Sequence, residues 1–337
     1  MINSISLPEL HHFPVMLKEV IKICSPKKDG VYIDCTFGGG NYTESILKFS
    51  DTKVIAFDRD SFVFQISDNL KKKYPSRFFF HHKKFSEINR VIADNSAEAV
   101  IFDLGLSSIQ LNNLKRGFSF NSKDNLDMAM GLSVTSAEKV VNELSEQQLK
   151  TIIKILGEEQ EASRIAKNII KYRNIKKITS TADLVKIIEK SKKKNFLSKI
   201  NPCTKTFQAL RIFVNKEITE LIEGITNATR ILKPGGKILV VSFHSIEDKI
   251  VKFFFSNFSS NKSNPSRYFP KINNNNYALF KDYKNKIFKA DKSEINKNPP
   301  SRSAKLRFAI RNSNKFNYPQ ELKDKFEKYL KIEDCYA

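Results

Sequence analysis

The chain has few cysteines, and the four that it has lie far apart. Cys24, Cys35, Cys203 and Cys335 form no CxxC pair, so the sequence offers neither the paired spacing of a zinc site nor a disulfide framework. Scattered thiols suit a reducing compartment, and we therefore expect a cytoplasmic protein. The five histidines also lack convincing metal-ligand spacing, which predicts that no metal is required.

Long apolar runs are absent as well. The N-terminal segment MINSISLPELHHFPVML has no basic start followed by an apolar core, so no signal peptide is evident. The longest apolar runs, such as ILVV at 238–241, are far too short to span a bilayer. We therefore expect no membrane among the partners.

Acidic residues are outnumbered by basic ones. The 58 Lys and Arg residues stand against 36 Asp and Glu residues, a net charge of +22. A field of one sign and this size favours a polyanionic partner, of which nucleic acid is the commonest. Lysines scattered for solubility would give the same count, so both interpretations stay open on charge alone.

Short apolar runs alternate with helical patterns in the first hundred residues. Segments 31–35, 53–58, 77–82, 99–105 and 237–243 have the character of buried strands. Such alternation predicts an α/β fold with a parallel sheet and right-handed crossovers. Residues 303–311 alternate in polarity and would add a last strand, for which an edge of the sheet is one open position.

Helical sequence fills the gap between the fourth and fifth strands. Ser145 and Gln148 have the spacing of a capping box and open a helical stretch through residue 172. Residues 179–190 predict another helix, and residues 207–232 carry apolar side chains along one helical face. We expect the basic segment 190–200 to lie in a loop between these helices.

The predicted organisation is an α/β domain in two parts, residues 1–107 and 213–311, with an inserted helical domain at 108–212. Within the second part, residues 256–300 are rich in Asn and Lys and are expected to be a long irregular excursion without a function. Residues 312–337 would be a peripheral helix or a disordered tail.

The turn after the first strand, residues 34–42 (DCTFGGGNY), predicts a ligand site. It misses the G-x-G-x-x-G spacing of a dinucleotide turn, and an acid at the strand end would repel a pyrophosphate. Asp34 suits a ligand with a cationic end, such as the amino acid part of S-adenosylmethionine. Asp58 ends the second strand, where a carboxylate can accept ribose hydroxyls, and Asp103 ends the fourth. An ordinary glycine turn beside solvated acids stays the alternative.

Ten motifs follow one another along the chain. In order, they are HFPVMLKEV (12–20), the glycine turn, AFDRD (56–60), FDLGLSSIQL (102–111), RGFSF (116–120), LDMAM (126–130), GEEQEASRIAKNI (157–169), TKTFQALRIFVN (204–215), SFHSIEDKIVK (242–252) and NPPSRSAKLR (298–307). Together they resemble the RsmH (MraW) family of bacterial small-subunit rRNA methyltransferases. The resemblance covers about residues 11–311.

The resemblance implies a Rossmann-like class I methyltransferase sheet with an inserted all-helical domain that would recognise RNA. It also implies transfer of a methyl group from S-adenosyl-L-methionine to N4 of a specific cytidine in the decoding region (P site) of 16S rRNA during small-subunit maturation. The partners would be 16S rRNA and the small ribosomal subunit, and a monomer and a homodimer both stay open. The implied cofactor-binding residues are Gly40, Asn41, Tyr42, Asp58, Phe85, Asp103 and Gln110.

One departure from the family concerns the glycine turn. Many relatives have Gly-Gly-His where this chain has Gly40-Asn41-Tyr42. Asparagine tolerates the left-handed backbone better than other non-glycine residues, so we expect the turn to survive.

Asp103 and His244 are the expected catalytic residues. The lone pair of the cytosine amine is delocalised into the ring, so transfer needs alignment and a hydrogen-bond acceptor. DNA amino-methyltransferases carry D/N-P-P-Y/F at the end of the fourth strand, whereas Asp103 is followed here by Leu-Gly-Leu. Phe118 or Phe120 would then supply the base platform, unless they are core aromatics. His244 would accept the departing proton or orient a loop.

Six basic residues are the candidates for holding RNA phosphates, although each could be a solvated surface charge: Arg116, Lys205, Arg211, Arg302, Lys305 and Arg307. Three other functions stay open. They are an NAD-dependent oxidoreductase, a non-catalytic RNA-binding assembly factor that keeps the cofactor pocket, and an amine methyltransferase acting on DNA.

Overall fold

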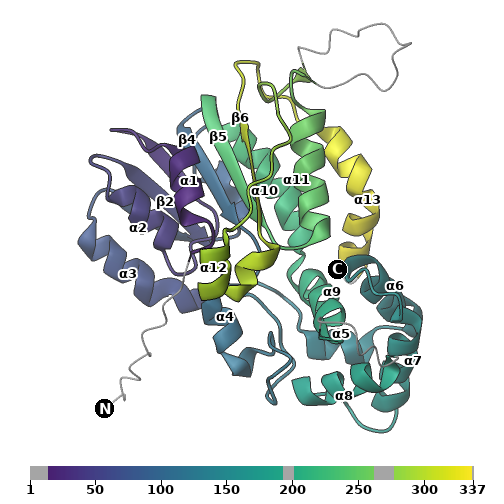
Figure 1. Ribbon diagram of the computed structural model, residues 1–337. Helices are drawn as coiled ribbons and strands as arrows, with labels where there is room; N and C mark the ends of the chain where they lie inside the picture. Colours follow the sequence, from purple (N-terminus) through teal and green to yellow (C-terminus); the bar gives the residue numbers. More distant parts are fainter. Residues whose placement is uncertain (1–13, 193–200, 262–276, 336–337) are drawn as a thin grey trace, which may run out of the picture.

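The sheet of this protein joins strands from both ends of the chain. The computed structural model describes residues 14–192, 201–261 and 277–335, and within them six strands form one sheet in the order β3-β2-β1-β4-β5-β6. β1 (Val31–Asp34), β2 (Lys53–Asp58), β3 (Phe78–His82), β4 (Ala97–Asp103) and β5 (Leu232–Ser242) are parallel. β6 (Lys305–Ile310) is antiparallel to β5 at one edge (Figure 1). The predicted α/β fold and edge strand are confirmed.

Helices cover both faces of the sheet. α1 (Leu17–Cys24), α2 (Asn41–Leu47) and α3 (Phe64–Lys73) pack on one face, against a core that includes Tyr32 and Val54. α10 (Glu217–Ile231) and α11 (Ser245–Asn257) pack on the other, against a core that includes Ile33 and Phe102. Since neighbouring residues of a strand point to opposite faces, both faces of the central strands are buried.

Shorter elements connect the strands at the edge where β1, β2 and β4 end. They are η1 (Ser61–Val63), η2 (Phe85–Arg90), α4 (Ser108–Asn112) and η3 (Leu114–Arg116). α12 (Lys292–Lys297) and η5 (Pro299–Ser303) lead into β6. The predicted excursion is therefore partly regular, and Phe280 within it is completely buried beside Phe254 and Phe255. Most of the basic segment 190–200 lies outside the described residues.

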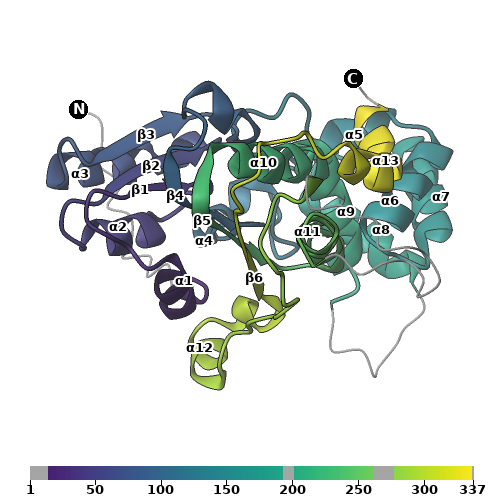
Figure 2. The same cartoon turned by 90° about the horizontal axis from the view of Figure 1, so that it is seen from above.

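Five of the described helices between β4 and β5 form a group beside the sheet (Figures 1 and 2). They are α5 (Ala137–Glu143), α6 (Glu146–Leu156), α7 (Ala162–Arg173), α8 (Thr181–Ser191) and α9 (Thr204–Asn215). Ser145 and Gln148 form the predicted capping box. The helical stretch expected through residue 172 consists of two helices, because α6 ends before Gly157 and α7 begins at Ala162. A Cβ atom on Gly157 would lie 2.4 Å from the Lys205 carbonyl oxygen, so α9 approaches too closely for a side chain there.

The helix predicted over residues 207–232 is also two helices. Lys216 adopts a left-handed backbone with φ 49°, so α9 ends at Asn215 and α10 begins at Glu217. The buried Asn215 amide anchors this break, because its Oδ1 accepts hydrogen bonds from Met130 N (2.8 Å) and Ser133 Oγ (2.6 Å). A new helix N-terminus is thereby created close to the carboxyl ends of the strands.

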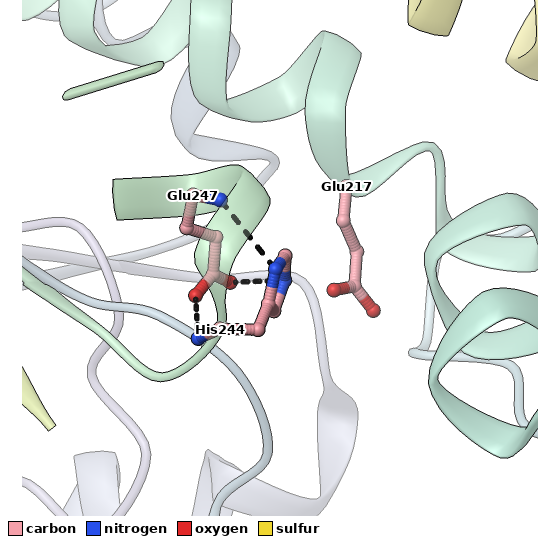
Figure 3. A group of neighbouring side chains, drawn as sticks. All are labelled: Glu217, His244 and Glu247. Atoms are coloured by element: carbon pink, nitrogen blue, oxygen red, sulfur yellow. Dashed lines mark hydrogen bonds and ion pairs between the residues drawn. The ribbon is translucent and has the colours of Figure 1, made fainter. Parts of the chain in front are cut away.

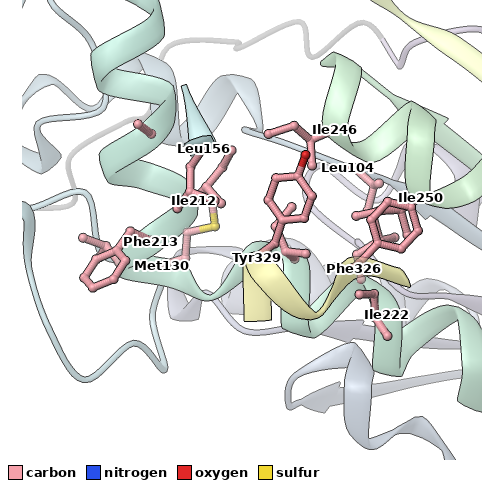
Figure 4. Packing of buried hydrophobic residues seen from close by; sticks show 14 of the residues in the cluster. Leu104, Met130, Leu156, Ile212, Phe213, Ile222, Ile246, Ile250, Phe326 and Tyr329 are labelled. Atoms are coloured by element: carbon pink, nitrogen blue, oxygen red, sulfur yellow. The ribbon is translucent and has the colours of Figure 1, made fainter. Parts of the chain in front are cut away.

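The C-terminal segment is a helix, but it is not peripheral. α13 (Gln320–Asp334) buries Phe326 and Tyr329 in the same core as Leu104 and Ile212 (Figure 4). Glu333 accepts hydrogen bonds from the amides of Ile218 and Thr219 and so caps α10. One core thus runs from the sheet into the helical group, and the predicted domain boundaries stay predictions. None of the described helices is long and apolar enough for a bilayer crossing.

Candidate active site

A pocket opens where β1, β2 and β4 end. Its walls come from the glycine turn, the segment after β4, the first turn of α10 and the loop before β6. The space between them is ≈ 1360 Å³, open solvent at the mouth included, which can admit a ligand of nucleoside size. Parallel α/β sheets bind their ligands at this edge.

Carboxylates dominate the charged groups of the pocket wall. Arg59 is the one basic residue among the described lining residues. The acidic lining residues are Asp58, Asp60, Asp103, Glu217, Glu220 and Glu247. The pocket is therefore strongly acidic in a chain whose net charge is +22, and it favours a ligand that carries positive charge.

The glycine turn brings backbone close to this pocket. Gly38 and Gly40 have left-handed backbones with φ 48° and 74°, and the Gly38 amide donates a 2.8 Å hydrogen bond to Asp58 Oδ2. Asn41 is the first residue of α2 and does not have a positive φ. The concern over Asn41 is thus resolved, because Gly40 carries the left-handed position. Gly38, Gly39, Asn41 and Tyr42 line the pocket, but Gly40 does not.

Asp58 lies at the end of β2, as predicted for a residue that accepts ribose hydroxyls. Its two oxygens accept hydrogen bonds from the amides of Gly38 (2.8 Å) and Asp60 (2.9 Å). Burial nevertheless raises the pKa of Asp58 to about 6. A carboxylate held in this way by two backbone amides has a fixed orientation at the pocket wall.

Asp103 lies at the end of β4 with one oxygen unsatisfied. Burial, and then the charge of Asp34, raise the pKa of Asp103 to about 8, although a hydrogen bond with Tyr42 opposes the shift. Its Oδ1 is buried and has no hydrogen-bond partner among the described residues. Leaving such an oxygen unpaired is unfavourable, so a cationic donor bound beside it would both satisfy the oxygen and stabilise the ionised form.

Gln110 and Phe85 also reach the pocket. Gln110 Oε1 accepts from the Ser107 amide (2.9 Å) in the capping box of α4, and its Nε2 donates to Asp60 Oδ2 (2.9 Å). Phe85 packs edge-on against Phe102 at 5.3 Å between ring centroids. The structure therefore brings together at one pocket all the predicted cofactor residues except Gly40.

The placement of Arg116 contradicts the expectation that it holds RNA phosphates. Its guanidinium is 9% exposed, pairs with Asp60 and donates to the Ala129 carbonyl oxygen. It also lies over the rings of Phe62 and Phe118, at 4.9 and 5.1 Å from their centroids. Arg116 therefore supports the pocket wall from behind through Asp60.

The two aromatic residues proposed as a base platform are not presented to a base. Phe118 is 6% exposed, beneath Arg116. Phe120 is half-buried against Phe207, at 6.2 Å between ring centroids. Neither residue lines the pocket, so the alternative of core aromatics fits both better.

Two more of the predicted RNA-binding cations are already held by carboxylates of the protein. Arg211 is bound by Glu217 through two hydrogen bonds of 2.7 and 2.8 Å, and Arg307 is 2% exposed and paired with Asp248. Both placements contradict a role in contacting phosphates. Lys205 donates to the Glu158 carbonyl oxygen, and Lys305 is partly exposed beside Asp248. Of the six cations, Arg302 is the one with an exposed side chain and no ion pair to a described residue.

His244 stands next to two carboxylates at the start of α11 (Figure 3). Its Nδ1 accepts a 3.4 Å hydrogen bond from the Glu247 amide as a helix cap, and its Nε2 lies 3.1 Å from Glu247 Oε1. The side chain is 8% exposed and does not line the pocket. Glu217, His244 and Glu247 offer ligand atoms within 4.8 Å of one another, which is a possible arrangement for a metal ion.

The position of the ring proton argues against two roles for His244, as a metal ligand and as a base. Because Nδ1 accepts the capping hydrogen bond, the hydrogen-bond network assigns the ring proton to Nε2. Nε2 then has no lone pair for a metal ion or for a proton unless the cap is lost. Both oxygens of Glu217 are already held by Arg211. The expectation that His244 accepts the departing proton therefore does not fit, and the ring instead caps α11 through the Glu247 amide.

Sequence reasoning missed several lining residues. Asp60 lies within the AFDRD motif, but its side chain was not singled out. Glu217 and Glu220 were placed inside one long helix, so the turn that brings them to the pocket was not foreseen. Asn298 and Pro300 line the pocket from a segment to which no function was given.

The sequence of this chain is similar to the sequences of known proteins. The MraW methylase family matches residues 9–312. A protein of Ehrlichia ruminantium (strain Welgevonden), named Ribosomal RNA small subunit methyltransferase H, is 39% identical over 308 residues, which cover 90% of this chain and 100% of that protein. Proteins of the same name from Bartonella grahamii (43% identity, 89% of each chain) and from a Wolbachia of Drosophila simulans (41% identity, 88% of this chain and 97% of the other) are similar.

Proposed function

Because the chain belongs to the MraW methylase family, we propose that this methyltransferase acts on small-subunit ribosomal RNA and methylates N4 of a cytidine in the decoding region. Its cofactor is S-adenosyl-L-methionine. Relatives that carry the name of a small-subunit rRNA methyltransferase cover nearly the whole chain. The N4 position and the decoding region rest on the resemblance of the motifs and are the part to be tested.

The observation that carries this proposal is the acidic pocket with its unsatisfied Asp103 oxygen. S-adenosyl-L-methionine is cationic at its amino group and at its sulfonium, and it ends in a ribose and an adenine. Asp103 would receive the amino group, and Asp58 would accept the ribose hydroxyls. The donors and acceptors present thus fit this cofactor at both places.

The cofactor supplies an electrophilic methyl group, and the protein supplies alignment. Asp103 and the glycine turn would hold the cofactor in one orientation at the end of β4. The Tyr42 hydroxyl lies between Asp103 and the Val15 carbonyl oxygen, and its one proton is shared between these two acceptors. Carboxylates along the same wall can accept a hydrogen bond from the target amine, which favours a localised lone pair on its nitrogen. His244 would contribute by capping α11, the helix that carries Glu247.

RNA binding would use the exterior of the protein. Enzymes that modify a base take it out of its stack, so the target cytidine would leave its stack to enter the pocket. Exposed cations such as Arg302, next to the pocket residue Pro300, would contact phosphates and fix the position of the RNA.

Methyl transfer to small ribosomal subunits that lack the modification tests the proposal. Labelled S-adenosyl-L-methionine is incubated with the protein and the subunits, and the rRNA is analysed by nucleoside mass spectrometry. N4-methylcytidine in the decoding region is the expected product. Label in another nucleoside would keep the methyltransferase activity but refute the proposed target.

A further inference from the structure

Glu220 is a second pocket carboxylate with an oxygen left unpaired. The residue is 6% exposed and lines the pocket from the first turn of α10. Its Oε2 is buried and has no hydrogen-bond partner among the residues that the structure describes. A buried carboxylate oxygen of this kind calls for a donor from a bound molecule.

The position of Glu220 in the pocket differs from that of Asp103. Its Oε1 lies 3.6 Å from Nζ of Lys84, the residue that precedes Phe85 in the segment after β3. Because the strand order is β3-β2-β1-β4, the ends of β4 and β3 lie on opposite sides of Asp58 at the end of β2. A ligand that places its amino acid part at Asp103 and its ribose at Asp58 therefore brings its base toward Glu220.

The protein itself does not satisfy the free oxygen. The nearby guanidinium of Arg59 donates its hydrogen bonds to the carbonyl oxygens of Met130 (3.1 Å) and Asn215 (2.9 Å) and to Ser133 Oγ (2.9 Å). The segment after β3, residues 83–86 (KKFS), contains no carboxylate. On this side of the pocket Glu220 is thus the acidic acceptor beside Phe85.

We propose that Oε2 of Glu220 accepts a hydrogen bond from the exocyclic amine of the adenine ring and so selects adenine over hypoxanthine. The inference rests on S-adenosyl-L-methionine as the cofactor. A carboxylate accepts hydrogen bonds but cannot donate one when it is ionised. The carbonyl oxygen that hypoxanthine carries in place of the amine would meet a buried negative charge and be rejected.

Titration calorimetry with S-adenosyl-L-homocysteine and S-inosyl-L-homocysteine tests the inference without any RNA. The wild-type protein should prefer the adenosine compound by at least about 100-fold. Glu220→Gln should narrow this preference by at least about tenfold, because an amide can donate to the hypoxanthine carbonyl. Glu223→Gln is the matched control, since Glu223 lies on the same helix, pairs with Lys323 and does not line the pocket. It should leave the preference unchanged.

Two other results with Glu220→Gln would overturn the inference. Equal weakening of both compounds by Glu220→Gln would overturn the inference and indicate a contact with the ribose or a purely structural role. An unchanged preference would overturn it too. If the variant does not fold, the wild-type protein alone is used. An analogue of S-adenosyl-L-homocysteine with hydrogen in place of the 6-amino group should then bind at least about tenfold more weakly than S-adenosyl-L-homocysteine itself. Failure of wild-type protein to bind S-adenosyl-L-homocysteine would instead refute the proposed function.

Discussion

The pocket and the rest of the chain carry opposite charge. Among the described residues, six carboxylates and one arginine line the pocket, whereas the whole chain has 58 basic and 36 acidic residues. Buried charges act over short distances with little screening, while exposed charges act through a field that salt weakens. The contrast indicates two ligands. A small cationic cofactor would bind inside through short-range contacts with carboxylates, and a polyanion would bind outside through the field of the exposed cations.

The largest effect is expected when the carboxylate of Asp103 is removed from the pocket. Asp103→Ala should lower methyl transfer by about 1000-fold or more, because the cofactor loses the carboxylate that orients it. The protein should stay folded, since the substitution removes a buried and incompletely paired carboxyl. Activity assays with calorimetry and circular dichroism check both statements. Asp94→Ala, at an exposed ion pair with Arg230, is the control, and full activity of Asp103→Ala would refute the mechanism.

The two regions should also differ in how strongly salt weakens the binding of their ligands. Raising the salt concentration from 50 to 200 mM should weaken RNA binding at least about tenfold, because counterions compete for the phosphate contacts. Binding of S-adenosyl-L-homocysteine should change less than about twofold, since the pocket carboxylates are buried or half-buried. Parallel titrations with RNA and with the cofactor product measure both. Equal salt sensitivity of the two ligands would mean that the pocket is not electrostatically distinct.

The pH dependence of cofactor binding sharpens the role of Asp103. Burial raises its pKa to about 8, so the carboxyl is mostly protonated at pH 6 and ionises as the pH rises. The ammonium group of S-adenosyl-L-homocysteine prefers the ionised form of Asp103. The affinity for this ligand should therefore rise between pH 6 and 7.5, by up to about tenfold per pH unit. Asp103→Asn should flatten this slope. A slope that survives in the variant would assign the titration to another group.

The raised pKa of Asp103 also makes the stability of the ligand-free protein depend on pH. A carboxyl whose pKa is higher in the folded state binds protons more readily when folded, so its contribution to stability is present at low pH. That contribution is lost as the pH rises from about 4 to 8. Asp103→Asn should reduce this loss in thermal unfolding.

The smallest effect is expected at the exposed cations. Arg302→Ala should weaken RNA binding by about two- to fivefold, because one phosphate contact of several is lost. Binding of the cofactor product should not change. Arg230→Ala, at the other end of α10 from the pocket, serves as the control in the same RNA titration. An unchanged RNA affinity of Arg302→Ala would remove this residue from the interface.

The sequence predicted what depends on local pattern. Strand positions, the glycine turn and the acids at the ends of β1, β2 and β4 follow from short runs of residues, and the structure confirms these positions. The breaks at Gly157 and Lys216 were missed because they depend on tertiary contacts, the approach of the Lys205 carbonyl and the buried Asn215 amide. A 3.6-residue periodicity continues through such a break and cannot reveal it.

The predicted RNA-binding residues show the same limit. Arg116, Arg211 and Arg307 cannot be told from surface cations by residue type, because their partners Asp60, Glu217 and Asp248 are known only from the fold. His244 lies at the expected edge, but its protonation is determined by the capping hydrogen bond from Glu247. Spacing along the chain therefore located the pocket and could not assign the roles of its individual charges.

Titration of the full chain with S-adenosyl-L-homocysteine and, separately, with NADH tests the central claim most directly. The claim is that buried carboxylates select a cationic cofactor and exclude one that carries a pyrophosphate. The account predicts one binding site for S-adenosyl-L-homocysteine and no measurable binding of NADH. Binding of NADH without binding of S-adenosyl-L-homocysteine would contradict it.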